Sequence, residues 1–215
     1  MSQGARKVHQ KRSRKTRDKL LNALEKLLKE KDFAEIGVSE IAKEADVSPA
    51  TIYRRFNKKE GFIPVLFDLY LERLNDWITS PDAQMDLEGA DLRSAMHQVS
   101  KVAWAQLQQQ IHILRAIYLH GRHHLNLLGE QGDHFEAAML GATKAIVEYY
   151  AHEVTHKDPE TAARMLAYYF NTILIERGLF RKQSVTWTDD ISDDDFIHEI
   201  AEFAYSYLTA GRQIA

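Results

Sequence analysis

The chain of 215 residues contains no cysteine, and it has only four prolines and ten glycines. Without cysteine it can form no disulfide and offers no thiolate nucleophile, which is compatible with a reducing cytoplasm. No stretch approaches the roughly 18 uninterrupted apolar residues of a membrane span. The basic amino-terminal segment is not followed by an apolar run, so we expect no signal peptide there. These absences predict a cytoplasmic protein built from long regular elements.

Charge is distributed unevenly along the chain. Residues 1–60 carry 16 Lys and Arg against 9 Asp and Glu, a net charge of +7, whereas the remaining 155 residues carry a net charge of −10. Seven basic residues and no acid precede Asp18. Because basic segments of this kind neutralise phosphates and release counterions, the amino-terminal part favours a polyanionic partner.

Residues 38–56 have the pattern of two short helices joined by a tight turn. Small and apolar residues recur at three-and-four spacing over 38–45, which predicts a helix with one buried face. Asp46 lies where a turn with positive φ is expected, and Asp tolerates that conformation. Ser48 is the predicted N-cap of the second helix, accepting from a free N–H, and Pro49 suits the first helical position. This unit is typical of proteins that bind DNA.

Residues 16–62 resemble the DNA-binding domain of the TetR family of transcriptional regulators. Gly37 and Asp46 depart from the family pattern, which usually has Thr and Gly there. The resemblance implies a homodimeric repressor that binds a palindromic operator in duplex DNA and is released by a small-molecule effector. It implies no cofactor, no resident metal and no enzymatic activity. The matching residues are Ile41, Ala42, Ala45, Val47, Ser48, Thr51, Tyr53, Phe56, Lys59, Glu60 and Phe62.

The second helix and the residues after it supply the predicted DNA contacts. The resemblance assigns Thr51, Tyr53 and Lys59 to the phosphate backbone. Arg54 or Arg55 is expected to bind a base edge, typically guanine, and a plain phosphate contact is the alternative for either. The predicted DNA-binding set is Ser48, Pro49, Ala50, Thr51, Tyr53, Arg54, Arg55, Lys58 and Lys59.

Helical period covers the rest of the chain, and no segment has a convincing strand pattern. The sequence therefore predicts an all-α protein of about nine helices. We expect a basic flexible tail at 1–15, a three-helix helix-turn-helix domain at 16–62, and an effector-binding and dimerisation domain at 63–215. The predicted helices run from near Thr16 to before Asp32, over 38–45 and 49–55, from an N-cap at Asn57 to Ile78, and over 89–109, 111–128, 133–156, 159–179 and 193–210.

Large apolar side chains with a few polar neighbours are the candidates for the effector cavity. A place in the protein core is the alternative for each aromatic residue among them. An arginine on a largely apolar helix favours an anionic or carbonyl-bearing ligand. The predicted ligand-binding residues are Phe67, Tyr70, His97, Trp104, Arg115 and Tyr118.

The last two helices each carry two adjacent apolar stripes, which is more than one core needs. The resemblance implies that they pair with their symmetry mates in a four-helix bundle. Core helices of a monomer are the alternative. The predicted interface residues are Ala163, Phe170, Ile173, Ile200, Phe203 and Tyr207.

Two groups of histidines leave other functions open. The segment His152–His156 matches the H-E-x-x-H motif, in which two His bind zinc and Glu153 activates water. A zinc-dependent hydrolase is therefore an alternative, although no third-ligand motif follows. His120, His123 and His124 could bind a metal, or could form a solvated surface. A third alternative is a helical ligand-binding protein without DNA recognition, against which the intact second helix argues.

Overall fold

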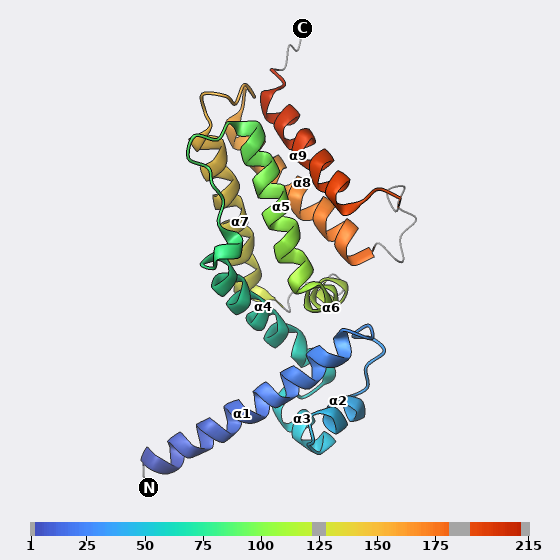
Figure 1. The fold of residues 1–215 in the computed structure, drawn as a ribbon. Helices are drawn as coiled ribbons and strands as arrows, with labels where there is room; N and C mark the ends of the chain where they lie inside the picture. Colours follow the sequence, from blue (N-terminus) through green and yellow to red (C-terminus); the bar gives the residue numbers. More distant parts are fainter. Residues whose placement is uncertain (1–2, 122–127, 181–189, 212–215) are drawn as a thin grey trace. The chain divides into compact units, whose positions relative to one another are not determined.

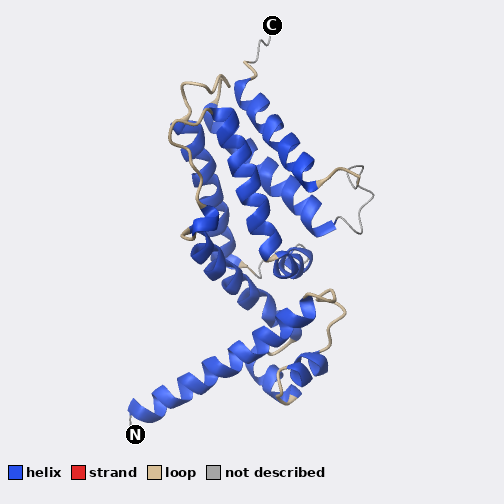
Figure 2. Cartoon of the chain, in the orientation of Figure 1, coloured by secondary structure: helices blue, strands red, loops and turns tan. Residues whose placement is uncertain are grey.

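The computed structural model describes residues 3–121, 128–180 and 190–211, with side chains described from residue 14. These residues form helices and no strand (Figure 1, Figure 2). The prediction of an all-α protein is confirmed, and nine α-helices lie within the described ranges. They are α1 (Gln3–Leu28), α2 (Val38–Glu44), α3 (Pro49–Phe56), α4 (Phe62–Ile78), α5 (Leu92–Gln109), α6 (Ile111–Gly121), α7 (Gly129–Tyr149), α8 (Pro159–Phe180) and α9 (Asp193–Thr209), with short 3-10 helices η1 (Lys59–Gly61) and η2 (Pro81–Ala83) on either side of α4.

The chain divides into two compact units. Unit 1 comprises residues 1–72 and 112–128, and unit 2 comprises residues 73–111 and 129–215. Almost all of α6 therefore belongs to the same unit as α1, α2 and α3, although the sequence assigned it to the effector domain. In the part of the chain that the structure describes, no helix is long and apolar enough to cross a membrane.

Unit 1 has a small core beneath its first three helices. Leu24 of α1, Ile41 of α2 and Ile52 of α3 are fully buried. The Phe56 ring at the end of α3 stacks on Phe62 at the start of α4, with ring centroids 3.9 Å apart. Burying each such side chain stabilises the fold by about 1.5–3 kcal/mol, so these contacts fix α3 against α1 and α2.

The first helix begins much earlier than the sequence predicted. α1 starts at Gln3 rather than near Thr16, so the segment expected to be a flexible tail forms its first turns. Apolar periodicity gave no sign of this extension because the segment has no apolar stripe to bury. Lys and Arg are nevertheless good helix formers, and they continue the helix outward from its packed part.

Unit 2 is a bundle in which α5 packs against α9 and α7 packs against α8 (Figure 1). Trp104 of α5 contacts Phe196 of α9, with ring centroids 5.6 Å apart. Gly178 lies where α8 meets α5: a Cβ there would come within 2.4 Å of a Leu107 methyl group and 3.1 Å of one from Ile111. The missing side chain thus allows the two helices to approach closely. Leu92, Met96, Leu166, Ala201 and Leu208 fill the centre of this bundle.

Capping side chains define the starts of two helices in unit 2. Ser192 caps α9 as predicted, because its Oγ accepts from the Asp195 backbone N at 3.1 Å. Asp91, which the sequence analysis did not single out, caps α5 by accepting from the Ser94 backbone N at 2.8 Å. Hydrogen bonds from the Ser94 side chain and backbone lower the pKa of Asp91 below its ordinary value.

Other predicted helix boundaries also differ from the structure: α5 begins at Leu92 instead of residue 89, α7 begins at Gly129 instead of residue 133, and two larger differences lie at Asn57 and at the end of α7. Asn57 is not the N-cap of α4 but the C-cap of α3, with a φ of 61° that Asn tolerates well. α4 begins only at Phe62, after the 3-10 turn. At the other boundary, α7 ends at Tyr149, and residues 150–156 form turns and irregular backbone instead of continuing the helix.

Candidate nucleic-acid interface

A tight turn joins α2 to α3. Asp46 has a φ of 53°, which confirms the positive value predicted from the sequence. Val47 N donates to Ala42 O at 2.9 Å and closes the turn. Ser48 is the N-cap residue and Pro49 occupies the first turn of α3, also as predicted. The described residues therefore contain a complete helix-turn-helix.

The hydroxyl of Ser48 does not cap α3 in the predicted way. It makes no hydrogen bond to an N–H of the helix and lies 3.1 Å from the Thr51 hydroxyl instead. The Thr51 backbone N donates to the backbone O of Ser48 at 2.9 Å. Two hydroxyl groups thus lie together at the start of α3, where the helix dipole and free N–H groups favour a phosphate.

The outer face of α3 is open to solvent. Ile52 and Phe56 are buried, whereas Tyr53 is 53% exposed and so is not a core residue. Arg54 is exposed and Arg55 is half-buried. The helix itself contains no acidic residue, and it exposes the phenol of Tyr53 and the guanidinium of Arg54 to solvent. Such groups suit phosphates and the acceptor edge of guanine.

Lys59 makes hydrogen bonds that the sequence analysis did not predict. Its Nζ donates to the backbone O atoms of Phe33, Ala34 and Ile36 at 2.8, 3.1 and 3.0 Å. The ammonium group also lies 4.8 Å from the centroid of the Phe33 ring. An ammonium has three N–H donors, and these three carbonyls account for all of them. Lys59 therefore ties the α1–α2 loop to the end of α3 in this structure, and its contact with the phosphate backbone stays a prediction.

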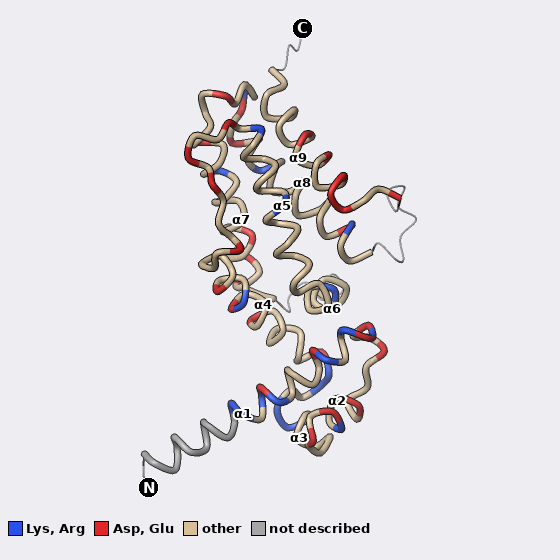
Figure 3. The backbone as a smooth tube through the Cα atoms, in the orientation of Figure 1, with Lys and Arg blue, Asp and Glu red and all other residues tan. Residues whose placement is uncertain are grey.

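Two other lysines of unit 1 are held by carboxylates. Lys26 Nζ lies 2.6 Å from Glu44 Oε1, and Lys31 Nζ lies 2.5 Å from Glu40 Oε1. These hydrogen bonds raise the pKa of each lysine above its ordinary value. Lys58, by contrast, is exposed. Figure 3 shows that basic and acidic residues both lie along the coloured part of α1 and along α2.

The six predicted effector residues are divided between the two units. Phe67 and Tyr70 on α4 are buried in unit 1, whereas Trp104 is buried in unit 2. These three placements fit the core role that the sequence left as the alternative. Arg115 and Tyr118 lie on α6 in unit 1, and both are half-buried. A single cavity formed by the six residues stays a prediction.

His97, the sixth of these residues, belongs to an ion-pair cluster between α5 and α9. Its Nε2 lies 2.8 Å from Glu202 Oε1, and Arg93 Nη2 lies 3.1 Å from Glu202 Oε2. The hydrogen bond with His97 and the charge of Arg93 lower the pKa of Glu202. The ring of His198 lies beside that of His97, with centroids 4.9 Å apart. The cluster therefore holds the two helices together.

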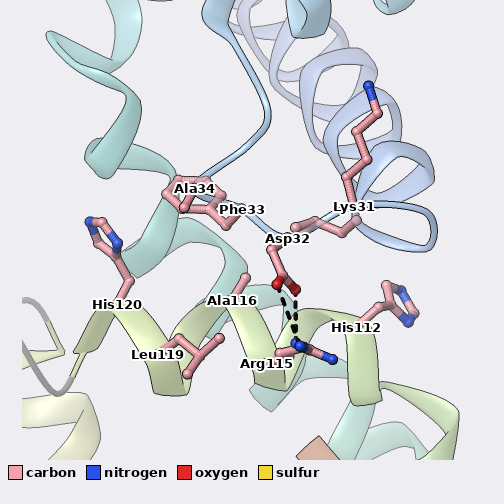
Figure 4. A pocket seen from close by; sticks show the side chains of 10 residues that line it. Lys31, Asp32, Phe33, Ala34, His112, Arg115, Ala116, Leu119 and His120 are labelled. Carbon is pink, nitrogen blue, oxygen red and sulfur yellow. Dashed lines mark hydrogen bonds and ion pairs between the residues drawn. The ribbon is translucent and has the colours of Figure 1, made fainter. Parts of the chain in front are cut away.

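A pocket of about 280 Å³ lies within unit 1, between the end of α1, the loop that follows it, and α6 (Figure 4). Arg115 forms an ion pair there: its Nε lies 2.8 Å from Asp32 Oδ1 and its Nη2 lies 3.4 Å from Oδ2. His120 packs edge-on against Phe33, with ring centroids 5.2 Å apart. The sequence analysis singled out Arg115 but missed its partner, which lies 83 residues earlier and shares no local pattern with it.

The H-E-x-x-H segment does not have the geometry of a zinc site. It follows the end of α7 at Tyr149, so His152 and His156 do not share a helical face. The carboxylate of Glu153 accepts from the Leu92 backbone N at 3.1 and 3.2 Å, at the start of α5. Because the motif requires helical spacing and a Glu free to activate water, the zinc-hydrolase alternative loses its structural basis.

The second histidine group is only partly described. His120 packs on Phe33 in the pocket of unit 1, whereas His123 and His124 lie outside the described residues. Within residues 14–121, 128–180 and 190–211, no three His, Asp or Glu side chains are placed to hold a metal ion.

The predicted dimer residues occupy different environments. Ala163, Phe170 and Ile200 lie in the core of the protomer itself, so they are not available to a partner in this arrangement. Phe203, by contrast, is 66% exposed, which is unusual for a large apolar side chain. Ile173 and Tyr207 are half-buried, and the exposed apolar residues on α8 that the prediction missed are Met165 and Tyr168.

Comparison with known proteins gives a family for the amino-terminal domain. Residues 20–64 match the family model for bacterial regulatory proteins of the tetR family. An uncharacterized HTH-type transcriptional regulator of Mycobacterium tuberculosis is 48% identical over 44 residues. That match covers 20% of this chain and 22% of the relative's length.

Solved structures extend the likeness to the whole fold. A bacterial regulatory protein of the tetR family from Rhodococcus RHA1 aligns with a TM-score of 0.64 at 15% identity, over 90% of this chain and 97% of that one. NalD from Pseudomonas aeruginosa, described as the secondary repressor of the MexAB-OprM multidrug efflux pump, aligns with a TM-score of 0.53 at 18% identity, over 90% and 97%. Residues 20–64 are thus identified as a DNA-binding domain of the tetR family, and the chain shares the all-helical fold of these solved structures.

Proposed function

We propose that the protein is a ligand-responsive transcriptional regulator that binds duplex DNA as a homodimer. The outer face of α3 carries this proposal. Tyr53 and Arg54 are exposed there, on a helix that contains no acid and is the second helix of a complete helix-turn-helix. Proteins with this motif place the second helix in the major groove of DNA. The family of the amino-terminal domain supports the same function.

Contacts in the groove follow from the side chains on α3. Arg54 and Arg55 are the proposed donors to the O6 and N7 atoms of guanine, where a bidentate arginine gives base discrimination. Thr51 and Tyr53 lie on the same helix and would contact phosphates. Lys58, which is exposed beside the end of α3, replaces Lys59 as the proposed lysine contact to the backbone.

Two copies of the chain would read a palindrome. The recognition helices of a two-fold dimer contact successive major grooves when they lie about one helical turn of DNA apart. Phe203 and Tyr168, both well exposed on the last two helices, are the proposed contacts between the copies. A dimer would remove these large apolar side chains from water, which is the main driving force of such association.

The proposed regulation is repression that a small molecule relieves. NalD, which shares the fold, is described as a repressor, and this supports the same sign of regulation here. If the effector binds better to the conformation that cannot bind the operator, then effector and operator must lower each other's binding affinity by the same factor. No cofactor is needed for such a switch, and the proposed location is the cytoplasm, where the DNA of a bacterium lies.

Selection of binding sites tests this proposal directly. The purified full-length chain is incubated with random duplex DNA at moderate salt, and bound duplexes are amplified over several rounds and sequenced. We expect a palindrome whose half-sites are separated by about one helical turn or a multiple of it. Enrichment of no sequence, with binding that depends on salt alone, would overturn sequence-specific regulation.

A further inference from the structure

The pocket of unit 1 contains charged groups that the proposed function does not use. Four of its lining side chains can carry positive charge: Lys31, which is paired with Glu40, His112, which is paired with Glu25, and Arg115 and His120. The lining includes one carboxylate, that of Asp32, which is paired with Arg115 (Figure 4). Leu28 of α1, Phe33 of the loop that follows and Ala116 of α6 also line the pocket, and all three are buried apolar residues. The pocket thus places the Arg115–Asp32 ion pair beside apolar surface.

We propose that this pocket binds a small carboxylic acid with a compact apolar body. In the structure Arg115 already binds a carboxylate, that of Asp32: Nη2 donates to Oδ2 at 3.4 Å, and Nε lies 2.8 Å from Oδ1 but makes no hydrogen bond within the described part of the chain. A guanidinium can bind a carboxylate through two parallel N–H donors, and the pair with Asp32 leaves the Nε donor of Arg115 unsatisfied. The ligand's carboxylate takes the place of Asp32 on Arg115, and its hydrocarbon part covers Phe33 and Ala116.

The size of the pocket limits the ligand. Its volume of about 280 Å³ lies just below the usual range for ligand sites, which is about 300–1,000 Å³. A single aromatic ring or a short branched chain fits this space, whereas a polycyclic compound does not. The ligand class is therefore a monocarboxylate of one ring or of comparable bulk.

The pair that the ligand replaces is weak enough to be exchanged. The Arg115 side chain is 24% exposed and that of Asp32 is 33% exposed. Water and salt screen ion pairs at this degree of exposure, and their net contribution to stability is small. Asp32 lies in the loop after α1, so its side chain can turn to solvent when an external carboxylate takes its place.

The pocket wall is joined to the DNA-binding face. Phe33 and Ala34 line the pocket, and their backbone carbonyls accept hydrogen bonds from Lys59, three residues beyond the end of α3. A ligand that displaces this loop would change the hydrogen bonds between the loop carbonyls and Lys59, and so the support of the end of α3. This regulatory consequence rests on the proposed function, whereas the carboxylate chemistry of the pocket does not.

Titration of the full-length chain with benzoate, followed by calorimetry in the absence of DNA, tests the site. Benzamide, which has the same ring but no charge, is the matched probe. We expect benzoate to bind and benzamide to bind at least about tenfold more weakly, because an arginine loses its charge-assisted contacts to the neutral amide. Since no DNA is present, failure here leaves the DNA-binding proposal standing, and failure of DNA binding leaves this result standing.

Three variants are expected to change benzoate binding in different ways. Arg115→Gln should weaken benzoate binding about tenfold or more, whereas Asp32→Asn should strengthen it about threefold or more by removing the internal competitor. Arg164→Gln removes an exposed arginine that pairs with Glu160 on α8, and it should change nothing. Equal binding of benzoate and benzamide, no benzoate binding, or a change in the same direction for Arg115→Gln and Asp32→Asn would overturn the proposal.

Discussion

Lys59 occupies a position where the sequence suggests a phosphate contact, but its three hydrogen bonds are to carbonyls of the α1–α2 loop. Those carbonyls lie 23 to 26 residues earlier in the chain. Their direction depends on the loop backbone, which no residue pattern specifies. The exposed residues of α3 were easier to predict. Once the apolar residues of a short helix are assigned to the core, the residues on its opposite side must face solvent. Tyr53 and Arg54 are outward for that reason.

Replacing Lys59 by Met distinguishes the two roles. We expect Lys59→Met to lower the free energy of unfolding by about 2 kcal/mol, because loop carbonyls lose charged donors. Its affinity for DNA should fall without a change in the salt dependence of binding. Lys58→Met should show the reverse: unchanged stability and a salt slope reduced by about 1, as for a lost phosphate contact. Urea unfolding and anisotropy titrations over a range of salt measure both. A reduced slope in Lys59→Met would restore the phosphate contact.

Gly61 permits the close turn between α3 and α4. A Cβ at this position would lie 2.4 Å from the backbone O of Phe56, which cannot move aside as a flexible side chain could. Gly61→Ala should therefore lower the free energy of unfolding by about 1–3 kcal/mol. Gly141→Ala is the control, since that Cβ would meet open space on α7 and should stabilise the helix by about 1 kcal/mol. Equal effects of the two changes in urea unfolding would contradict this account.

At the scale of whole elements, the sequence predicted helices well where they carry an apolar stripe or a strong cap. The turn at Asp46 and the cap at Ser192 are examples, because each is set by a few neighbouring residues. The prediction was wrong where contacts with distant parts of the chain determine the end of a helix. α7 was extended through Glu153, but that carboxylate caps α5 instead, 61 residues away in the chain. The predicted first helix was too short because residues 3–15 have no apolar period in the sequence.

The cluster between α5 and α9 makes stability depend on pH. The pKa of Glu202 is lowered in the folded protein, first by its hydrogen bond with His97. A carboxyl group with a lowered pKa contributes stability above its ordinary value of 4.5 and loses that contribution as the pH falls below it. Glu202→Gln should therefore be less stable than the wild type at neutral pH, and the difference should shrink below pH 4.5.

Urea unfolding at a series of pH values measures this difference. Glu199→Gln, an exposed position on the same helix, is the control. A Glu202→Gln deficit that stays constant down to the lowest pH at which the protein folds would contradict an electrostatic role for the cluster.

At the scale of the whole molecule, the sequence could not separate the core of one protomer from the contact between two. Both produce the same apolar period on a helix, so Ala163, Phe170 and Ile200 were predicted at the interface although they are buried within the chain. Only the folded structure shows which apolar residues of these helices stay exposed after the chain has formed its own core. Phe203 and Tyr168 are among them, and they define the surface on which the proposed dimer depends.

A charge at this surface should separate the copies. Phe203→Glu would place an unpaired carboxylate in an apolar contact at a cost of about 3 kcal/mol, which raises the dimer Kd by about two orders of magnitude. Met85→Glu, at another exposed apolar residue, should have no such effect. Sedimentation equilibrium of the two variants and the wild type tests this prediction. A dimer that survives Phe203→Glu with unchanged Kd would place the interface elsewhere.

The most direct test of the central claim is the affinity of the full-length chain for one selected duplex and for a scrambled duplex of the same length and composition, measured by fluorescence anisotropy at one salt concentration. The account predicts a preference of about 1,000-fold or more for the selected duplex, and its loss when Arg54 and Arg55 are both changed to Ala. Equal affinity for the two duplexes, or a preference that survives the double change, would contradict recognition of DNA by α3.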